Sequence, residues 1–90
     1  MMKYLVEFLG TMFLVFVIFT TGNWAAIGSA LAIACLLGGP ISGGAFNPAV
    51  AISLYSAGKL SKSDLIPYII VEVLGGLAAF FVYKKFVVKA

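Results

Sequence analysis

The chain has 90 residues and a formal net charge of +3, with 10% charged and 63% hydrophobic residues. A soluble domain carries about 25% charged residues, so this composition excludes an ordinary soluble protein and predicts an integral membrane protein in contact with the lipid bilayer. All six cations are lysines near the ends of apolar segments, which indicates anchoring at lipid headgroups and no nucleic-acid partner.

Side chains suited to metal or acid–base chemistry are scarce. The chain contains no histidine, one cysteine (Cys35) and three acids. A lone cysteine cannot form an intrachain disulfide, and this set offers neither a metal cluster nor a nucleophile–base pair. We therefore expect no metal, no cofactor and no enzyme activity. A cleavable signal peptide is not expected, because Glu7 interrupts an apolar stretch that is too long for one.

The first two apolar segments predict an antiparallel helix pair. Residues 4–21 would form a helix of about 27 Å, which is one membrane crossing. The break at Gly22-Asn23 is very short, so the next helix should pack beside the first. That helix is expected over residues 24–38, where Gly38-Gly39-Pro40 stops or bends it after only about 22 Å.

The stretch Ser42-Gly43-Gly44-Ala45-Phe46-Asn47-Pro48-Ala49-Val50 organises the rest of the chain. Its glycines allow an extended backbone with unpaired carbonyls, and Asn47-Pro48 has the N-cap and first-position signals of a new helix. A helix over residues 48–57 would be about 15 Å long, half a bilayer, and must return to the side it came from. The sequence therefore predicts a re-entrant loop and half-helix over residues 39–57. Such a break is tolerated only inside protein or beside an aqueous cavity.

A third crossing follows the polar loop at residues 59–64. Ser63 or Asp64 should cap a helix over residues 65–86, with Pro67 in its first turn. The fold class is therefore an all-α membrane protein with three transmembrane helices and one re-entrant half-helix. Its termini should lie on opposite sides of the membrane.

Three polar residues within the crossings are expected to face the protein interior. Glu7 and Thr11 share one face of the first helix, and Glu72 shares a face of the last helix with small residues. Buried acids in membrane helices are costly, so we interpret both carboxylates as structural acceptors for backbone N–H groups of the loop. A proton-relay role for the two acids is the alternative.

Three motifs together resemble one known family. Residues 42–50 resemble the first Asn-Pro-Ala loop of the aquaporin and glycerol-facilitator family, the major intrinsic proteins. Glu7-Phe8-Leu9-Gly10-Thr11 resembles the E-x-x-x-T motif of its first helix. Residues 68–76 resemble its third helix, where Gln is more usual than Glu72. The three elements occur in the family's order and cover nearly the whole chain.

The resemblance implies a passive channel built from two such units inverted across the membrane, with the two Asn-Pro-Ala half-helices meeting in the pore. These 90 residues correspond to one unit, a half-aquaporin. One half-helix alone would leave loop backbone facing lipid, so we expect a second unit from another chain. Each side of the membrane receives three lysines: Lys3, Lys59 and Lys62 on one side, and Lys84, Lys85 and Lys89 on the other. This balance predicts insertion in both orientations and an antiparallel homodimer, four of which would match the family's tetramers.

In such a dimer the two Asn47 side chains would meet in the pore. The expected pore-lining residues are Asn47, Pro48, Ala49, Gly43, Gly44, Ala45 and Phe46. The resemblance also indicates selectivity-filter candidates, which are Ile27, Cys35 and Val50, grouped with Gly44. The chain has no arginine, and Val50 stands where water-selective members carry one. We therefore expect a pore that passes water and small neutral solutes such as glycerol.

Three other functions remain open from the sequence. The unit could require a different partner chain that supplies an arginine after its own motif. Its glycine-rich helix faces would also suit a small membrane protein that binds other helices without transport. A proton or cation pathway through Glu7 and Glu72 is the third possibility.

Overall fold

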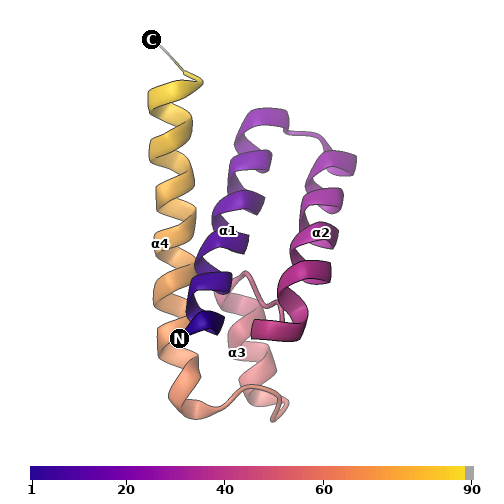
Figure 1. The fold of residues 1–90 in the computed structure, drawn as a ribbon, viewed down its shortest axis with the longest axis vertical. Coiled ribbons are helices and arrows are strands. Elements are labelled where there is room, and N and C mark those ends of the chain that lie inside the picture. The colour runs from indigo at the N-terminus through magenta and orange to yellow at the C-terminus, as the bar shows by residue number, and fades with distance from the viewer. Residues whose placement is uncertain (89–90) are drawn as a thin grey trace.

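The computed structural model of the chain describes residues 1–88, which form four α-helices. The helices α1 (Met2–Thr21), α2 (Trp24–Ser42) and α4 (Lys62–Phe86) are long and apolar enough to cross a membrane, whereas α3 (Pro48–Ser56) is too short. Figure 1 shows α1 between α2 and α4, with α3 beside the lower half of α4. The predicted fold class, an all-α membrane protein with three crossings and one half-helix, is confirmed.

The first connection is a tight turn with its own hydrogen bonds. Gly22 adopts a left-handed conformation with φ +54°, and its N–H donates to the Ile18 carbonyl at 3.0 Å. The Asn23 side chain caps α2 by accepting from the Ala26 N–H at 3.0 Å. These two caps satisfy helix-end groups that would otherwise remain unpaired, and they set α1 and α2 antiparallel.

The second helix is longer than expected. The prediction that Gly38-Gly39-Pro40 ends it near residue 38 is wrong, because α2 continues to Ser42 with Pro40 inside it. Proline removes only one N–H donor, and the helix beyond it is held by the Gly43 N–H, which donates to the Gly39 carbonyl at 2.8 Å. The α2 helix thus reaches about 29 Å, the length of a crossing.

Small residues allow the helices to pack closely. A Cβ at Gly75 of α4 would lie 2.5 Å from the Phe8 carbonyl oxygen and 3.3 Å from the Thr11 Cβ of α1. The α2 helix buries a regular stripe of small residues, one every four positions: Ala30, Ala34, Gly38 and Ser42. In lipid, where no hydrophobic effect draws helices together, such close backbone approach provides the packing energy.

The last helix begins earlier than predicted. Ser61, and not Ser63 or Asp64, caps α4 by accepting from the Asp64 N–H at 3.2 Å, so Pro67 falls beyond the first turn. The Asp64 carboxylate is instead held by the Lys3 ammonium at 2.8 Å and the Tyr4 hydroxyl at 2.6 Å. This contact fastens the start of α4 to the start of α1.

The lysines lie near the two ends of the bundle. The Lys3–Asp64 ion pair joins the starts of α1 and α4 at one end, and Lys84 and Lys85 lie in the last turn of α4 at the opposite end. Lys89, which the sequence also places at that far end, lies outside the described residues.

Candidate functional site

The segment between α2 and α3 enters the molecule and turns back. Figure 1 shows it rising from the lower end of α2, after which α3 runs down again to the same end. Gly43 and Gly44 have φ values of +88° and +69°, and Phe46 has φ +53°. Positive φ is unstrained for glycine and uncommon for other residues, so the fold holds Phe46 in a costly conformation.

Asn47 and Pro48 start the half-helix in the way that the sequence predicts. The Asn47 side-chain oxygen accepts from the Ala49 N–H at 2.7 Å, and Pro48 occupies the first helical position. Asn47 is exposed, and its amide nitrogen donates no hydrogen bond within residues 1–88. The capping bond therefore orients the amide with a donor available at the N-terminus of α3.

Glu7 holds the loop from α1. Its side chain is fully buried and accepts three hydrogen bonds: from the Phe46 N–H at 2.8 Å, the Ala45 N–H at 3.1 Å and the Ser42 hydroxyl at 2.7 Å. Two of these donors are backbone groups that the irregular loop leaves without helical partners. Glu7 thus makes the contacts expected of a structural acceptor for loop N–H groups.

Ser42 and Tyr68 complete this network; both lie in motifs noted in the sequence, but the sequence indicated no role for either side chain. The Tyr68 hydroxyl donates to the Ser42 carbonyl at 2.7 Å, so α4 is joined through α2 to Glu7 of α1. The Tyr68 ring also packs in a buried cluster with Ala45 and Ala51. The sequence did contain a signal that Tyr68 faces the protein interior, because Tyr68 lies one helical turn before Glu72 on the same face of the helix.

The Phe46 side chain packs between α1 and α2. Its side chain is 2% exposed, and its ring lies against Gly10 and Gly38, where a Cβ would collide with it. The sequence had indicated only its backbone carbonyl, as part of the pore lining. No local pattern marks this side chain as buried, because the two glycines that receive it lie on different helices.

Glu72 differs from Glu7, although both are buried. Glu72 is 1% exposed, yet neither of its carboxyl oxygens has a hydrogen-bond partner within residues 1–88. The prediction that it accepts hydrogen bonds from the loop is therefore wrong. The carboxyl lies near Glu7 and the Asn47 backbone N–H without reaching hydrogen-bonding geometry. Glu7 binds the N–H groups of Ala45 and Phe46 instead. The buried Thr11 hydroxyl is likewise unpaired among these residues.

Of the selectivity-filter candidates, the structure brings only Cys35 and Gly44 into contact within residues 1–88. The Cys35 thiol contacts the Gly44 carbonyl, with the sulfur and oxygen 3.9 Å apart. Ile27 lies eight positions before Cys35 on α2, about 12 Å along the helix, and Val50 lies on α3 with 41% of its surface exposed. A single unit therefore does not close a ring from these side chains.

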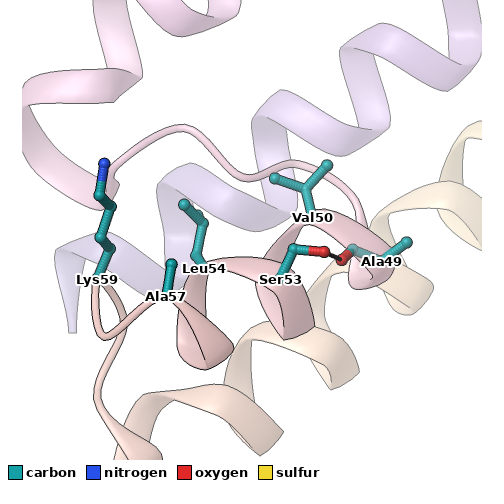
Figure 2. Close-up of a pocket in the computed structure, with 6 residues that line it drawn as sticks. All are labelled: Ala49, Val50, Ser53, Leu54, Ala57 and Lys59. Atoms are coloured by element: carbon teal, nitrogen blue, oxygen red, sulfur yellow. Dashed lines mark hydrogen bonds between the residues drawn. The ribbon is translucent and has the colours of Figure 1, made fainter.

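A groove of about 420 Å³ runs along the exposed face of α3. Its lining consists of Ala49, Val50, Ser53, Leu54, Ala57 and Lys59. Figure 2 shows the side chains of Val50, Leu54 and Lys59 projecting to the same side of α3. The Ser53 hydroxyl is turned back onto the Ala49 carbonyl at 2.9 Å, so the groove wall is mostly apolar with one ammonium group.

Three apolar helices long enough to cross a membrane, together with an Asn-capped half-helix that returns to its own side, define an integral membrane protein with a re-entrant segment. The chain belongs to the major intrinsic protein family: the profile of that family, described as Major intrinsic protein, matches residues 1–90. The matched range includes the Glu7 helix, the Asn47 loop and the Glu72 helix.

Curated relatives agree with this assignment. The chain is 41% identical to Glycerol uptake facilitator protein-like 6 of Lactiplantibacillus plantarum over 96 positions, which cover 97% of this chain and 44% of the relative. It is 55% identical to Aquaporin Z of Brucella melitensis over 49 residues, 54% of this chain and 21% of that protein. It is 41% identical to Aquaporin AqpM of Methanothermobacter thermautotrophicus over 68 residues, which cover 71% of this chain and 28% of that protein. The chain thus spans less than half the length of these relatives, and no solved structure matches it significantly.

Proposed function

We propose that this unit forms one half of a passive transmembrane pore for water and small neutral solutes of the glycerol class. The observation that carries this proposal is the exposed Asn47 amide at the start of α3, whose oxygen is fixed by the Ala49 N–H while its nitrogen keeps donors available. The names of the relatives, a glycerol uptake facilitator and two aquaporins, support the same solute class.

Donors and acceptors would line opposite sides of the solute path. The Asn47 amide nitrogen donates to a solute oxygen, and the loop carbonyls accept from solute hydroxyl groups. The carbonyls of Gly43, Ala45 and Phe46 receive no hydrogen bond within residues 1–88. Gly43 is exposed, so its carbonyl is open to a solute, whereas Ala45 and Phe46 are buried in the single unit. The positive N-terminal end of α3 disfavours cations at the same point. This combination selects neutral molecules that both donate and accept hydrogen bonds.

The proposed filter is apolar. The chain contains no arginine, and Val50 occupies the position after the Asn47 motif where the resemblance would place a cation in a water-selective channel. A ring of Ile27, Cys35, Gly44 and Val50, with members from two units, would contact carbon–hydrogen groups of a solute. We infer that solutes larger than water, such as glycerol, pass as well.

We further propose that an inverted copy of this chain supplies the second half. The loop exposes irregular backbone at Gly43 and Asn47, and a bilayer does not solvate such backbone, so another protein surface must cover it. The lysines of the described residues are spread over both ends of the bundle, so they do not favour one orientation. Inverted pairs of this kind are a common way to build a transport path.

The proposal predicts that Asn47→Asp removes solute flux without unfolding the chain. Aspartate still caps α3 through its carboxylate, but it replaces the amide donor with a negative charge. We expect water and glycerol permeability to fall at least about tenfold, the rate equivalent of one lost hydrogen bond of about 1.4 kcal/mol. Stopped-flow light scattering of vesicles that contain the purified chain measures both permeabilities.

The matched control is Asn23→Asp, the same change at the N-cap of α2, which lies in the exposed turn after α1. Its permeability should equal that of the parent chain. Parent vesicles no more permeable than empty ones would contradict the channel proposal and favour a helix-binding role. Equal loss of flux in both variants would show that Asn47 has no special part in transport.

A further inference from the structure

Lys59 is the one charged residue among residues 1–88 that lines the α3 groove. The remaining lining consists of alanine, valine and leucine side chains and a serine whose hydroxyl is turned onto the backbone. In Figure 2 the Lys59 side chain extends from the end of α3 to the same side as Val50. Low-polarity walls focus the field of a charge along a groove, so one ammonium group here has more influence than on an open surface.

The end of α3 fixes the backbone of Lys59. The Lys59 N–H donates to the Leu54 carbonyl at 2.8 Å, and the Gly58 N–H donates to the Tyr55 carbonyl at 3.0 Å. Together with the left-handed Gly58 at φ +76°, these two bonds form a Schellman motif. This motif turns the chain back at the end of α3, so the Lys59 side chain starts beside the groove.

The charge of Lys59 is not neutralised by a carboxylate in the described part of the chain. Asp64 is bound to Lys3 and Tyr4, while Glu7 and Glu72 are buried in the helix interfaces. The ion pair between Lys3 and Asp64 is the one salt bridge among residues 1–88. The groove therefore carries a positive charge that no carboxylate among residues 1–88 pairs with.

We propose that Lys59 is a specificity-determining residue of this groove: its ammonium group repels cations from the path along α3 and leaves that path open to neutral solutes that bear hydroxyl groups. The predicted effect of Lys59 on transport rests on the proposed function of α3 as a pore wall. The positive potential itself can be measured without any flux.

A cysteine probe at Val50 tests the potential directly. In a Cys35→Ser background, the substitution Val50→Cys introduces the one thiol of the chain. The rates at which this thiol reacts with cationic and anionic methanethiosulfonates are compared at low ionic strength in lipid vesicles. Replacing Lys59 with Gln should change each rate about threefold in opposite directions, as expected for one charge about 13 Å away along α3 at a dielectric constant between those of bulk water and a protein surface. The anionic-to-cationic ratio should therefore fall about tenfold, and Lys59→Glu should lower it further. Salt at 1 M should remove most of the difference.

Lys62→Gln is the matched control, because Lys62 is an exposed lysine on the adjoining segment that does not line the groove. It should leave the ratio within twofold of the parent. A second probe, Ser53→Cys, repeats the measurement at another groove position if Val50→Cys does not fold. An unchanged ratio in Lys59→Gln, or an equal change in Lys62→Gln, would overturn the inference.

Permeability of vesicles that hold the chain without the cysteine probes, so that Cys35 and Val50 are unchanged, separates this inference from the proposed function. If the ratio shifts but the parent chain passes neither water nor glycerol, Lys59 sets the potential of a groove that is not a pore, and the proposed function fails alone. If the parent conducts and Lys59→Glu leaves both the ratio and the sodium leak unchanged, the role of Lys59 fails alone. The expected result is a ratio of sodium leak to glycerol flux at least tenfold higher in Lys59→Glu than in the parent.

Discussion

Replacing Glu7 with alanine is expected to destabilise the chain by about 4 kcal/mol, because each buried donor left unpaired costs about 1–3 kcal/mol. Three donors lose their acceptor together: the Ala45 N–H, the Phe46 N–H and the Ser42 hydroxyl. Water cannot replace the carboxylate at a fully buried position surrounded by helices in lipid. Unfolding of the purified chain in mixed micelles, titrated with sodium dodecyl sulfate and followed by circular dichroism, measures the loss.

Glu72→Gln is the matched comparison for Glu7→Ala. Glu72 is as buried as Glu7, but its oxygens make no hydrogen bond within residues 1–88. The amide form removes a buried ionisable group without removing an existing contact, so we expect unfolding stability to stay the same or rise. If Glu7→Ala unfolds at the same detergent fraction as the parent, the loop is not held by this carboxylate. If Glu72→Gln destabilises the chain strongly, Glu72 has a partner that we have not identified.

Gly75→Ala is expected to cost about 3 kcal/mol, the upper range for overpacking one methyl group into a close contact. The new Cβ would lie 2.5 Å from the Phe8 carbonyl oxygen, and a backbone atom cannot move aside as a flexible side chain can. The α1 and α4 helices would have to separate, which would also loosen the contact between Thr11 and Gly75. The same detergent titration reports the change.

Gly76→Ala, one residue further, provides the control. A Cβ there would lie 3.8 Å from the Val15 side chain, an ordinary van der Waals contact. Alanine is the better helix former by about 0.5–1 kcal/mol, so stability should be unchanged or higher. Equal destabilisation by both substitutions would mean that helix flexibility, and not close packing, explains the glycine pair.

The sequence predicted the fold class because membrane length and turn chemistry are local signals. Apolar runs separated by Gly22-Asn23 and by the polar loop at residues 59–64 are enough to define crossings. Asn47-Pro48 likewise marks a helix start by local chemistry alone. The extension of α2 through Pro40 was missed because the tolerance of a helix for proline depends on the bonds that follow it, here from Gly43 to Gly39.

Contacts between distant segments were less accessible to sequence reasoning. Two buried glutamates lie in similar local sequences, yet only Glu7 binds the loop, because the path of residues 43–47 presents its N–H groups to α1. The Phe46 ring fills a space made by glycines of two helices, which no single helical period reveals. The position of Lys59 beside the groove depends on a three-dimensional turn at Gly58.

We propose that a second, inverted copy of this chain completes the pore, and the orientation of the chain in the membrane tests this most directly. A reporter at the C-terminus of the 90-residue chain is read from both sides of the membrane. Because the lysines near the two ends are nearly balanced, we predict a comparable signal from each side. Replacing Lys84 and Lys85 with glutamine should shift the population toward one orientation and serves as the control. A signal from one side only in the parent chain would contradict self-pairing and would require a second unit of different sequence.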